Sequence, residues 1–175
     1  MITVRYAGAR DAEALIALLK SLVAEPGINI PLAPDEVTLT LEQERELIAR
    51  VTDSPHGAMF VAADEHGAIV GELSVKAIST RRAVAHVATI GMSVAANHRR
   101  RGIGEQLLRE AIAWADDNDF LRLELYVYAR NAAAIALYEK LGFAIEGKRV
   151  AFIREGDAFV DDYVMARLSG AARAG

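Results

Sequence analysis

The spacing of apolar residues changes its period at a pair of glycines in the middle of the chain. Between Val84 and Val94 apolar side chains alternate with others, which predicts a strand with one buried face. After Gly102 and Gly104 the apolar residues recur at helical spacing as far as Asp117, so we expect a helix that begins at the glycines. The first amide groups of such a helix lack partners within it, and with the helix dipole they favour an anion such as a pyrophosphate.

The rest of the pattern predicts further strands and helices with no linker or repeat between them. Thr40 followed by Gln43 is the sequence signature of a helix N-terminus. The segments Asp64–Gly67 and Arg154–Asp157 are typical of turns between two strands. The expected order is strand, helix, helix, three strands, helix, strand, helix and two strands. Besides the elements named above, we expect strands at Ile2–Tyr6, Ala58–Ala63, Ile69–Ala77, Leu121–Val127, Ala151–Ile153 and Phe159–Met165, and a helix at Asp11–Val23.

Three ligand-binding or catalytic interpretations of the glycine region fail on spacing. A dinucleotide-binding fingerprint needs a third glycine, and Leu107 stands in its place. No phosphate-binding string of the Walker type occurs in the chain. The segment Gly91–Ala95 resembles the nucleophile elbow of hydrolases, but its final glycine is missing and the expected helix starts too late. An ordinary strand-to-helix turn without a ligand remains open for this loop alone.

A second motif lies about thirty residues beyond the glycine loop, after the strand expected at Leu121–Val127. Together the two motifs resemble the GNAT superfamily of acetyl-CoA-dependent N-acetyltransferases. The resemblance covers most of the chain and is strongest from about Val70 to Arg167. It implies an α/β fold with a mixed, twisted sheet of about seven strands and about four helices, splayed between strands 84–94 and 121–127. The motifs read Arg99-x-x-Gly102-x-Gly104 and Asn131-x-x-Ala134-x-x-Leu137-Tyr138-x-Lys140-x-Gly142-Phe143.

The resemblance also implies roles for individual residues. The backbone of Met92, Ser93 and Val94 would bind the pantetheine arm of acetyl-CoA as an added strand, and the Val94 amide would polarise the thioester carbonyl. The side chain of Tyr138 would stand beside the sulfur as the proton donor to the leaving thiolate. The residues implied for the pyrophosphate are Arg99, Arg100, Arg101, Gly102, Ile103 and Gly104, and those of the second motif implied to contact the cofactor are Asn131, Ala134 and Tyr138.

The general base is less well defined by the sequence. Many members of this family place a carboxylate on the strand before the loop, where this chain has Ala88 and Thr89. Two candidates remain: His86, expected on the same strand face as Ala88, and Glu72 on the adjacent expected strand. A structural histidine and a solvent-facing glutamate are the open alternatives. An α-amino group with a pKa near 8 is already about one-tenth neutral at pH 7, so the missing carboxylate favours α-amines over lysine-like amines.

Composition and charge narrow the class of protein. The 175 residues, 53% hydrophobic and 25% charged, suit one domain, expected at residues 1–168, with residues 169–175 as a flexible tail. A net charge of −4 argues against a nucleic-acid surface. The chain has no cysteine and its four histidines lack ligand spacing, so we expect no disulfide and no metal site. No apolar run approaches the length of a membrane span, and we expect a cytoplasmic protein.

The resulting functional hypothesis is direct acetyl transfer from acetyl-CoA to a primary amine in a ternary complex. A free amino acid is the first candidate acceptor, followed by a polyamine or a protein N-terminus. The alternatives are a non-catalytic acetyl-CoA-binding sensor and a transferase that uses a longer acyl donor. The resemblance further implies a homodimer, with the C-terminal hairpin as a candidate contact.

Overall fold

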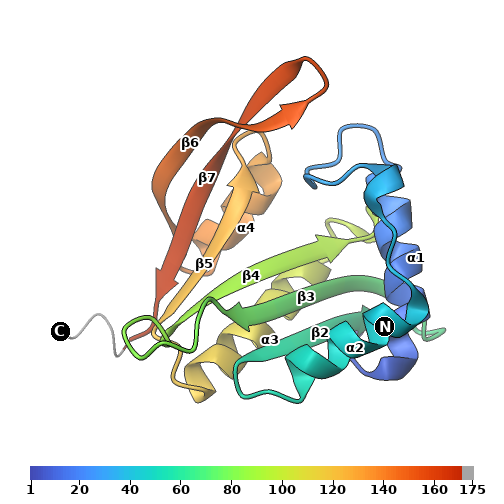
Figure 1. Cartoon of the computed structure of the whole chain (residues 1–175), viewed down its shortest axis with the longest axis horizontal. Helices are drawn as coiled ribbons and strands as arrows, with labels where there is room; N and C mark the ends of the chain where they lie inside the picture. Colours follow the sequence, from blue (N-terminus) through green and yellow to red (C-terminus); the bar gives the residue numbers. More distant parts are fainter. Residues whose placement is uncertain (171–175) are drawn as a thin grey trace.

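The chain forms one seven-stranded sheet with helices on both of its faces (Figure 1). We describe residues 1–170 of a computed structural model of the chain. The strand order is β1-β2-β3-β4-β5-β7-β6, and every neighbouring pair is antiparallel except β4 and β5. The mixed sheet, the four helices and the order of elements expected from the sequence are confirmed. The elements are β1 (Thr3–Tyr6), α1 (Ala12–Val23), α2 (Leu41–Thr52), β2 (Gly57–Ala63), β3 (Ile69–Ala77), β4 (Val87–Val94), α3 (Ile103–Asp117), β5 (Arg122–Tyr128), α4 (Ala132–Lys140), β6 (Ala144–Glu155) and β7 (Ala158–Leu168).

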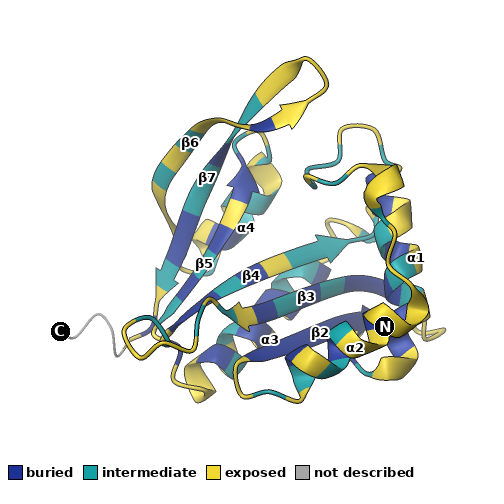
Figure 2. Ribbon diagram, viewed as in Figure 1, coloured by how far each residue is buried: buried dark blue, intermediate teal, exposed yellow. Residues whose placement is uncertain are grey.

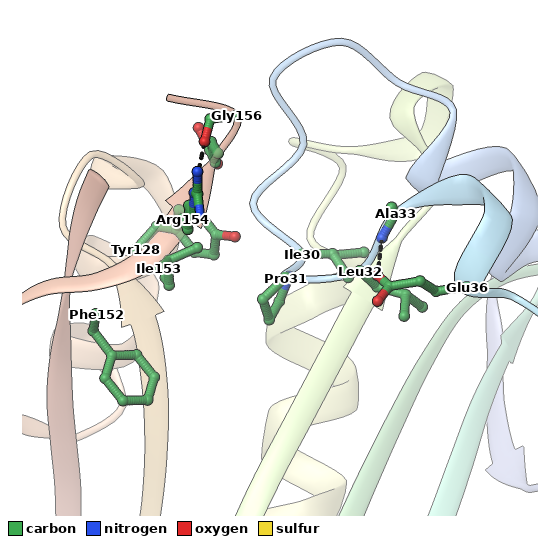
Figure 3. Close-up of a pocket in the computed structure, with 11 residues that line it drawn as sticks. Ile30, Pro31, Leu32, Ala33, Glu36, Tyr128, Phe152, Ile153, Arg154 and Gly156 are labelled. Atoms are coloured by element: carbon green, nitrogen blue, oxygen red, sulfur yellow. Dashed lines mark hydrogen bonds between the residues drawn. The ribbon is translucent and has the colours of Figure 1, made fainter. Parts of the chain in front are cut away.

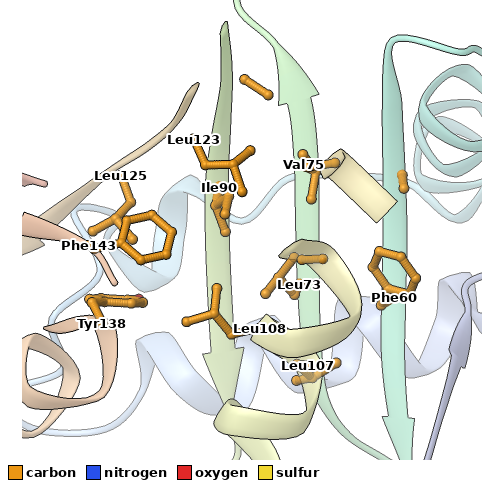
Figure 4. Close-up of a cluster of buried hydrophobic side chains, with 14 of the residues drawn as sticks. Phe60, Leu73, Val75, Ile90, Leu107, Leu108, Leu123, Leu125, Tyr138 and Phe143 are labelled. Carbon is orange, nitrogen blue, oxygen red and sulfur yellow. The ribbon is translucent and has the colours of Figure 1, made fainter. Parts of the chain in front are cut away.

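Two hydrophobic clusters hold the helices on the sheet. On one face, α1 and α2 pack over β2 and β3, with Leu15, Ile48 and Val61 in the cluster between them. On the other face, α3 and α4 share a larger cluster that includes Leu108 and Tyr138 (Figure 4). β2 lies between these two layers and is buried along its whole length (Figure 2). The sheet is therefore the rigid frame to which both helical layers attach.

Local sequence signals set the start of the helices near the first cluster. The Thr40 hydroxyl accepts a hydrogen bond from the Gln43 amide at 3.2 Å, and the Gln43 side chain accepts one from the Thr40 amide at 2.9 Å. This reciprocal capping is the arrangement that the sequence predicts for α2. Before α1, the buried Asp11 carboxylate binds the Arg5 guanidinium through two hydrogen bonds of 2.7 Å. That pair ties the start of α1 to β1.

The C-terminal hairpin is longer than its sequence pattern predicts. β6 extends over Ala144–Glu155 rather than over Ala151–Ile153 alone, and β7 continues past Met165 to Leu168. β6 is an edge strand with most side chains exposed, and its pairing with β7 is interrupted by register shifts. An exposed and bulged edge strand carries no regular apolar alternation, so periodicity could not mark its ends.

The strand expected at Val84–Val94 begins three residues later in the structure. β4 begins at Val87, because the Val87 amide donates to the Val84 carbonyl and the Val84 amide to the Arg81 carbonyl, which makes consecutive turns. His86 therefore lies in a turn and not on the strand face with Ala88. The prediction of its position is wrong.

The end of the described chain is anchored to the sheet. The Ser169 amide donates to the Leu121 carbonyl at 2.9 Å, and the residue is buried. Residues 171–175 of the expected tail lie outside the described residues. Within residues 1–170, no helix combines the length and the apolar character needed to cross a membrane.

Candidate active site

The two central strands separate after a short stretch of pairing. β4 and β5 pair in parallel at Val87–Thr89 only, although β4 continues to Val94 and β5 to Tyr128. Figure 1 shows the two strands diverging from their shared end. Beyond Thr89, the β5-facing edge of β4 therefore has no strand partner, and its backbone groups are available to another extended chain. This is the splay that the family resemblance implies.

The free part of β4 contains the three residues expected to bind pantetheine. Met92, Ser93 and Val94 are half-buried, and on their other side they pair with Leu73, Glu72 and Gly71 of β3. The Val94 carbonyl accepts a hydrogen bond from Arg99 Nε at 2.9 Å. The Ser93 hydroxyl donates to Glu72 Oε1 at 2.7 Å. One pair of strands thus brings together the unpaired β4 edge and a carboxylate.

The loop before α3 has the shape of an anion site. Gly102 has a left-handed φ of 79°, and Arg100 has one of 58°. No side chain caps the start of α3, in contrast to α2, so the first amides of α3 remain open. Within residues 1–170, no ion pair or side-chain hydrogen bond engages Arg100 or Arg101, and both side chains are exposed. Amides, helix dipole and two arginines therefore offer one positive surface.

Gly104 lets α3 start close to its neighbours. A Cβ atom at this position would lie 3.2 Å from Leu137 of α4 and 3.4 Å from Met92 of β4. Glycine is therefore the residue that allows the helix start, the free β4 edge and α4 to meet. Ile103, the residue before Gly104, is buried in the larger cluster and fixes the first turn of α3 against the sheet.

Arg99 differs from the arginines that follow it. Besides its bond to the Val94 carbonyl, its guanidinium forms an ion pair of 2.8 Å with Glu25. Glu25 follows the C-terminal end of α1, so Arg99 joins the α1–α2 loop to the end of β4. Arg99 thus binds other groups of the protein, whereas Arg100 and Arg101 face solvent.

Asn131 and Ala134 form the start of α4. The Asn131 side chain accepts a hydrogen bond from the Ala134 amide at 3.3 Å and so caps the helix. A single carbonyl oxygen is used in this cap, which leaves the side-chain NH2 group of Asn131 as a donor. Ala134 is half-buried in the first turn.

Tyr138 lies inside the larger cluster, with its ring against Phe143 at a centroid distance of 5.9 Å. Burial raises the pKa of Tyr138 to about 12. The hydroxyl makes no hydrogen bond to a described residue. It is nevertheless not among the fully enclosed side-chain polar atoms that lack a partner, because within residues 1–170 Ser169 Oγ is the one such atom. The Tyr138 hydroxyl is therefore not completely enclosed, although the residue is buried.

Glu72 has the electrostatic character of a base. Desolvation raises the pKa of its carboxyl to about 7, while the hydrogen bond from Ser93 acts in the opposite direction and the charge of Glu44 adds to the rise. A carboxyl with this pKa exchanges a proton near neutral pH. The structure thus places Glu72 next to the free β4 edge.

His86 is not part of this assembly. Its side chain is exposed in the turn before β4, and its carbonyl accepts hydrogen bonds from the Leu121 and Arg122 amides. It lies at the end of β4 opposite to Ser93, seven residues along an extended strand. Sequence proximity on one strand gave no information about which end of the strand forms the site.

A pocket of about 510 Å³ opens between the α1–α2 loop and the C-terminal hairpin. Figure 3 shows Ile30, Pro31 and Leu32 from the loop on one side and Phe152 and Arg154 from the hairpin on the other. Tyr128, which the sequence does not single out, also lines the pocket. The signal for Tyr128 was its place at the end of β5, beyond the point where the strands separate.

One guanidinium connects the two walls of this pocket. Arg130 Nε donates to Asn29 Oδ1 of the loop at 2.9 Å, and its two terminal nitrogens donate to the Glu155 carboxylate of the hairpin at 2.8 and 2.6 Å. The same group lies over the Tyr128 ring, 5.0 Å from its centroid. Among residues 1–170, no group of three or more residues of metal-binding type lies close enough to hold an ion.

Comparisons with known proteins agree with this geometry. Residues 27–143 match the acetyltransferase (GNAT) family. The chain is 33% identical over 175 aligned positions to the L-amino acid N-acetyltransferase AaaT of Escherichia coli, covering 95% of this chain and 98% of that relative. It is 36% identical to the N-alpha-acetyltransferase RimI of Mycobacterium tuberculosis, covering 67% of this chain and 70% of that relative. The crystal structure of a GNAT-family acetyltransferase from Streptococcus pneumoniae superimposes with a TM-score of 0.90 at 31% identity, covering 97% of this chain and all of that one.

The bridge made by Arg130 predicts a local change when it is removed. In Arg130→Gln, we expect amide hydrogen exchange to become severalfold faster in segments 28–33 and 152–157, because the loop loses its tie to the hairpin. Arg167→Gln is the matched control, since Arg167 also binds a carboxylate, Asp116, through two hydrogen bonds, but between α3 and β7. Equal exchange in both pocket walls of wild type and Arg130→Gln would contradict the bridging role.

Proposed function

The chain belongs to the GNAT family of acetyltransferases, and we propose that it transfers the acetyl group of acetyl-CoA to the primary amine of a free amino acid. The observation that carries this proposal is the unpaired edge of β4 directly beside the uncapped start of α3. An extended pantetheine arm needs an unpaired strand edge, and a pyrophosphate needs open amides at a helix start.

The donor is expected to lie along β4 and over the loop. We propose that the backbone of Met92, Ser93 and Val94 pairs with the pantetheine arm, and that the Val94 amide polarises the thioester carbonyl. The donor NH2 group of Asn131, at the start of α4 beside Ala134, would contact the arm from the other side. The residues proposed for the pyrophosphate are Arg100, Arg101, Gly102, Ile103 and Gly104, while Arg99 holds the end of β4 in place.

The acceptor pocket supports an amino acid more than a polyamine. Its acidic wall residues are Glu155, which is paired with Arg130, and Glu36, which accepts a hydrogen bond from the Ala33 amide, whereas no ion pair engages Arg154 within the described chain. Arg154 is therefore free to attract a carboxylate, and it disfavours a second cation. The apolar side chains of Leu32 and Phe152 offer contacts for an apolar side chain. The amino-acid acceptor named for the Escherichia coli relative supports the same choice.

We propose Glu72 as the general base. A carboxylate with a pKa of about 7 can take a proton from an α-ammonium group of pKa near 8 at a small free-energy cost of about 1.4 kcal/mol. The proton is transferred directly or through one water, since Glu72 lies on the strand next to the reacting edge. His86 is too far along β4 to share this role.

We propose Tyr138 as the proton donor to sulfur. Its pKa of about 12 exceeds that of an ordinary thiol, near 8.5, by about 3.5 units, or roughly 5 kcal/mol. A free tyrosinate would therefore be costly. Donation concerted with cleavage of the carbon–sulfur bond avoids that intermediate. The hydroxyl stays protonated throughout the working pH range.

The direct test is release of the CoA thiol by purified protein with acetyl-CoA and a panel of amino acids, polyamines and short peptides. We expect rapid release with amino acids, with apolar side chains ahead of charged ones. Because the chain has no cysteine, the enzyme adds no thiol background. Release with polyamines or peptides alone would identify that class, and not amino acids, as the acceptor. Binding of acetyl-CoA without any thiol release would favour a sensor.

Removal of the tyrosine hydroxyl tests the proton donor. In Tyr138→Phe, we expect acetyl-CoA affinity to be unchanged and turnover to fall by about tenfold or more, because the buried ring still packs against Phe143. Affinity measured by calorimetry and turnover measured by thiol release separate the two effects. Turnover equal to that of wild type would exclude the role.

The pH dependence of turnover tests the base. In wild type, the rate should rise as the pH increases through about 7, because Glu72 acts only when it is deprotonated. In Glu72→Gln, this limb should disappear and turnover at pH 8 should fall by at least about tenfold. His86→Ala is the control and should keep the wild-type profile, since His86 is exposed at the other end of β4. A retained limb in Glu72→Gln would assign the titration to another group.

A further inference from the structure

Glu72 belongs to a row of side chains that crosses the sheet under α1 and α2. The register places Arg5 of β1 opposite Val61, Val61 opposite Glu72, and Glu72 opposite Ser93. Residues that pair in this way project from the same face of a sheet. Val61 packs in the cluster beneath α1 and α2, so Glu72 and Ser93 face that layer as well.

A second carboxylate reaches this face from the helix above. Glu44 precedes Ile48 by one turn of α2, and Ile48 packs against the same cluster as Val61. The Glu44 residue is 7% exposed. Two acidic side chains, one from the helix and one from the strand, therefore lie on the same side of the sheet, and the charge of Glu44 contributes to the raised pKa of Glu72.

The charge of Glu44 has no protein counterpart. Within residues 1–170, the Glu44 carboxylate makes neither a hydrogen bond nor an ion pair, and burial raises its pKa. Its carboxylate is nevertheless absent from the fully enclosed polar atoms, so it opens onto accessible space. A buried carboxylate that finds no partner in its own chain is costly, unless a ligand supplies one.

The basic groups nearby are already engaged. On the row itself, Arg5 is bound by Asp11 through two short hydrogen bonds. At the end of α1, Arg99 is bound by Glu25. The residues of α1 that face the sheet are apolar, namely Leu15, Leu18 and Leu22. Glu44 is thus the charged group that acts on Glu72, and no cation of the described chain neutralises the pair.

We propose that Glu44 and Glu72 together form the site that binds the acceptor as its ammonium cation, with Glu44 as the second carboxylate of the pair. This inference rests on the proposed function and specifies how the amine enters. Glu72 of this pair accepts the hydrogen bond of Ser93, whose backbone belongs to the edge proposed for the thioester. An ammonium held there has its nitrogen near the reacting carbonyl before it loses a proton.

The proton balance of the reaction fits a pair of carboxylates. The ammonium gives one proton to the pair, and the nitrogen lone pair then forms a bond to the thioester carbon. When the carbon–sulfur bond breaks, sulfur keeps the electron pair and receives a proton from Tyr138, and the second nitrogen proton restores the tyrosine. The products are the amide and the CoA thiol, and the proton on the carboxylate pair leaves to solvent.

Substitution of Glu44 separates this role from a structural one. In Glu44→Gln, we expect the KM for the amine to rise by about tenfold or more, because the ammonium loses one of two buried charges. The pH limb assigned to Glu72 should move to lower pH, because the like charge that raises the pKa of Glu72 is gone. Glu46→Gln, an exposed acid on the same helix, is the control and should change neither value.

Stability gives an independent readout. A carboxyl whose pKa is raised by folding destabilises the native state as the pH rises through its unfolded pKa, so Glu44→Gln should be at least as stable as wild type at pH 8. Lower stability of Glu44→Gln would instead indicate a structural role and would overturn the proposal. Thermal or urea unfolding at pH 5 and pH 8 measures this difference.

Binding of n-butylammonium, followed by NMR titration, tests the site without turnover. We expect wild type and Glu46→Gln to bind this cation alike, and Glu44→Gln to bind it about tenfold more weakly or worse. Equal binding by Glu44→Gln, or no binding by wild type, would overturn the ammonium site. Failure of the proposed function has a separate signature, namely butylammonium binding without thiol release from acetyl-CoA with any amine.

Discussion

The separation of β4 from β5 after Thr89 is the constraint on which the rest of the site depends. β5 keeps a full ladder with β7, and β4 keeps one with β3, so each strand satisfies its outer edge while the inner edges part. Apolar side chains from both halves, such as Leu108, Leu125 and Tyr138, fill the wedge beneath the separation (Figure 4). The unpaired backbone of β4 is therefore a stable feature of the packing and does not require the sheet to open.

The buried and half-buried acidic side chains fall into two groups, those with and those without a basic partner. Most buried or half-buried acids are paired with arginine, as in Asp11 with Arg5 and Asp162 with Arg149. Among residues 1–170, no arginine pairs with Glu44 or Glu72, and desolvation raises the pKa of both. In the proposed mechanism, the lack of a cationic partner preserves the reactivity of these two carboxylates at a cost in stability.

The local features of the fold could be predicted from the residue pattern, whereas the mixed sheet and its splay could be predicted only through the family resemblance. The start of α2, the glycine loop and the end of α3 each depend on neighbours in the chain, and periodicity located them. The ends of β6 depend on pairing with β7 and carry little apolar signal. The sequence could not choose between Glu72 and His86 as the candidate base. The two residues differ in burial, and burial depends on which strands become neighbours. Glu44 gave no signal at all, since its run of helix acids resembles a solvated face.

The bridge from Arg130 has a consequence for how such a protein can diversify. Its partners Asn29 and Glu155 lie 101 and 25 residues away in sequence, on two surface segments that make few demands on the core. The loop and the hairpin can therefore exchange or gain residues, while the three bridging side chains preserve their mutual spacing. In the proposed function, acceptor choice then depends on segments that can change without altering β4 and α3, which carry the proposed donor site.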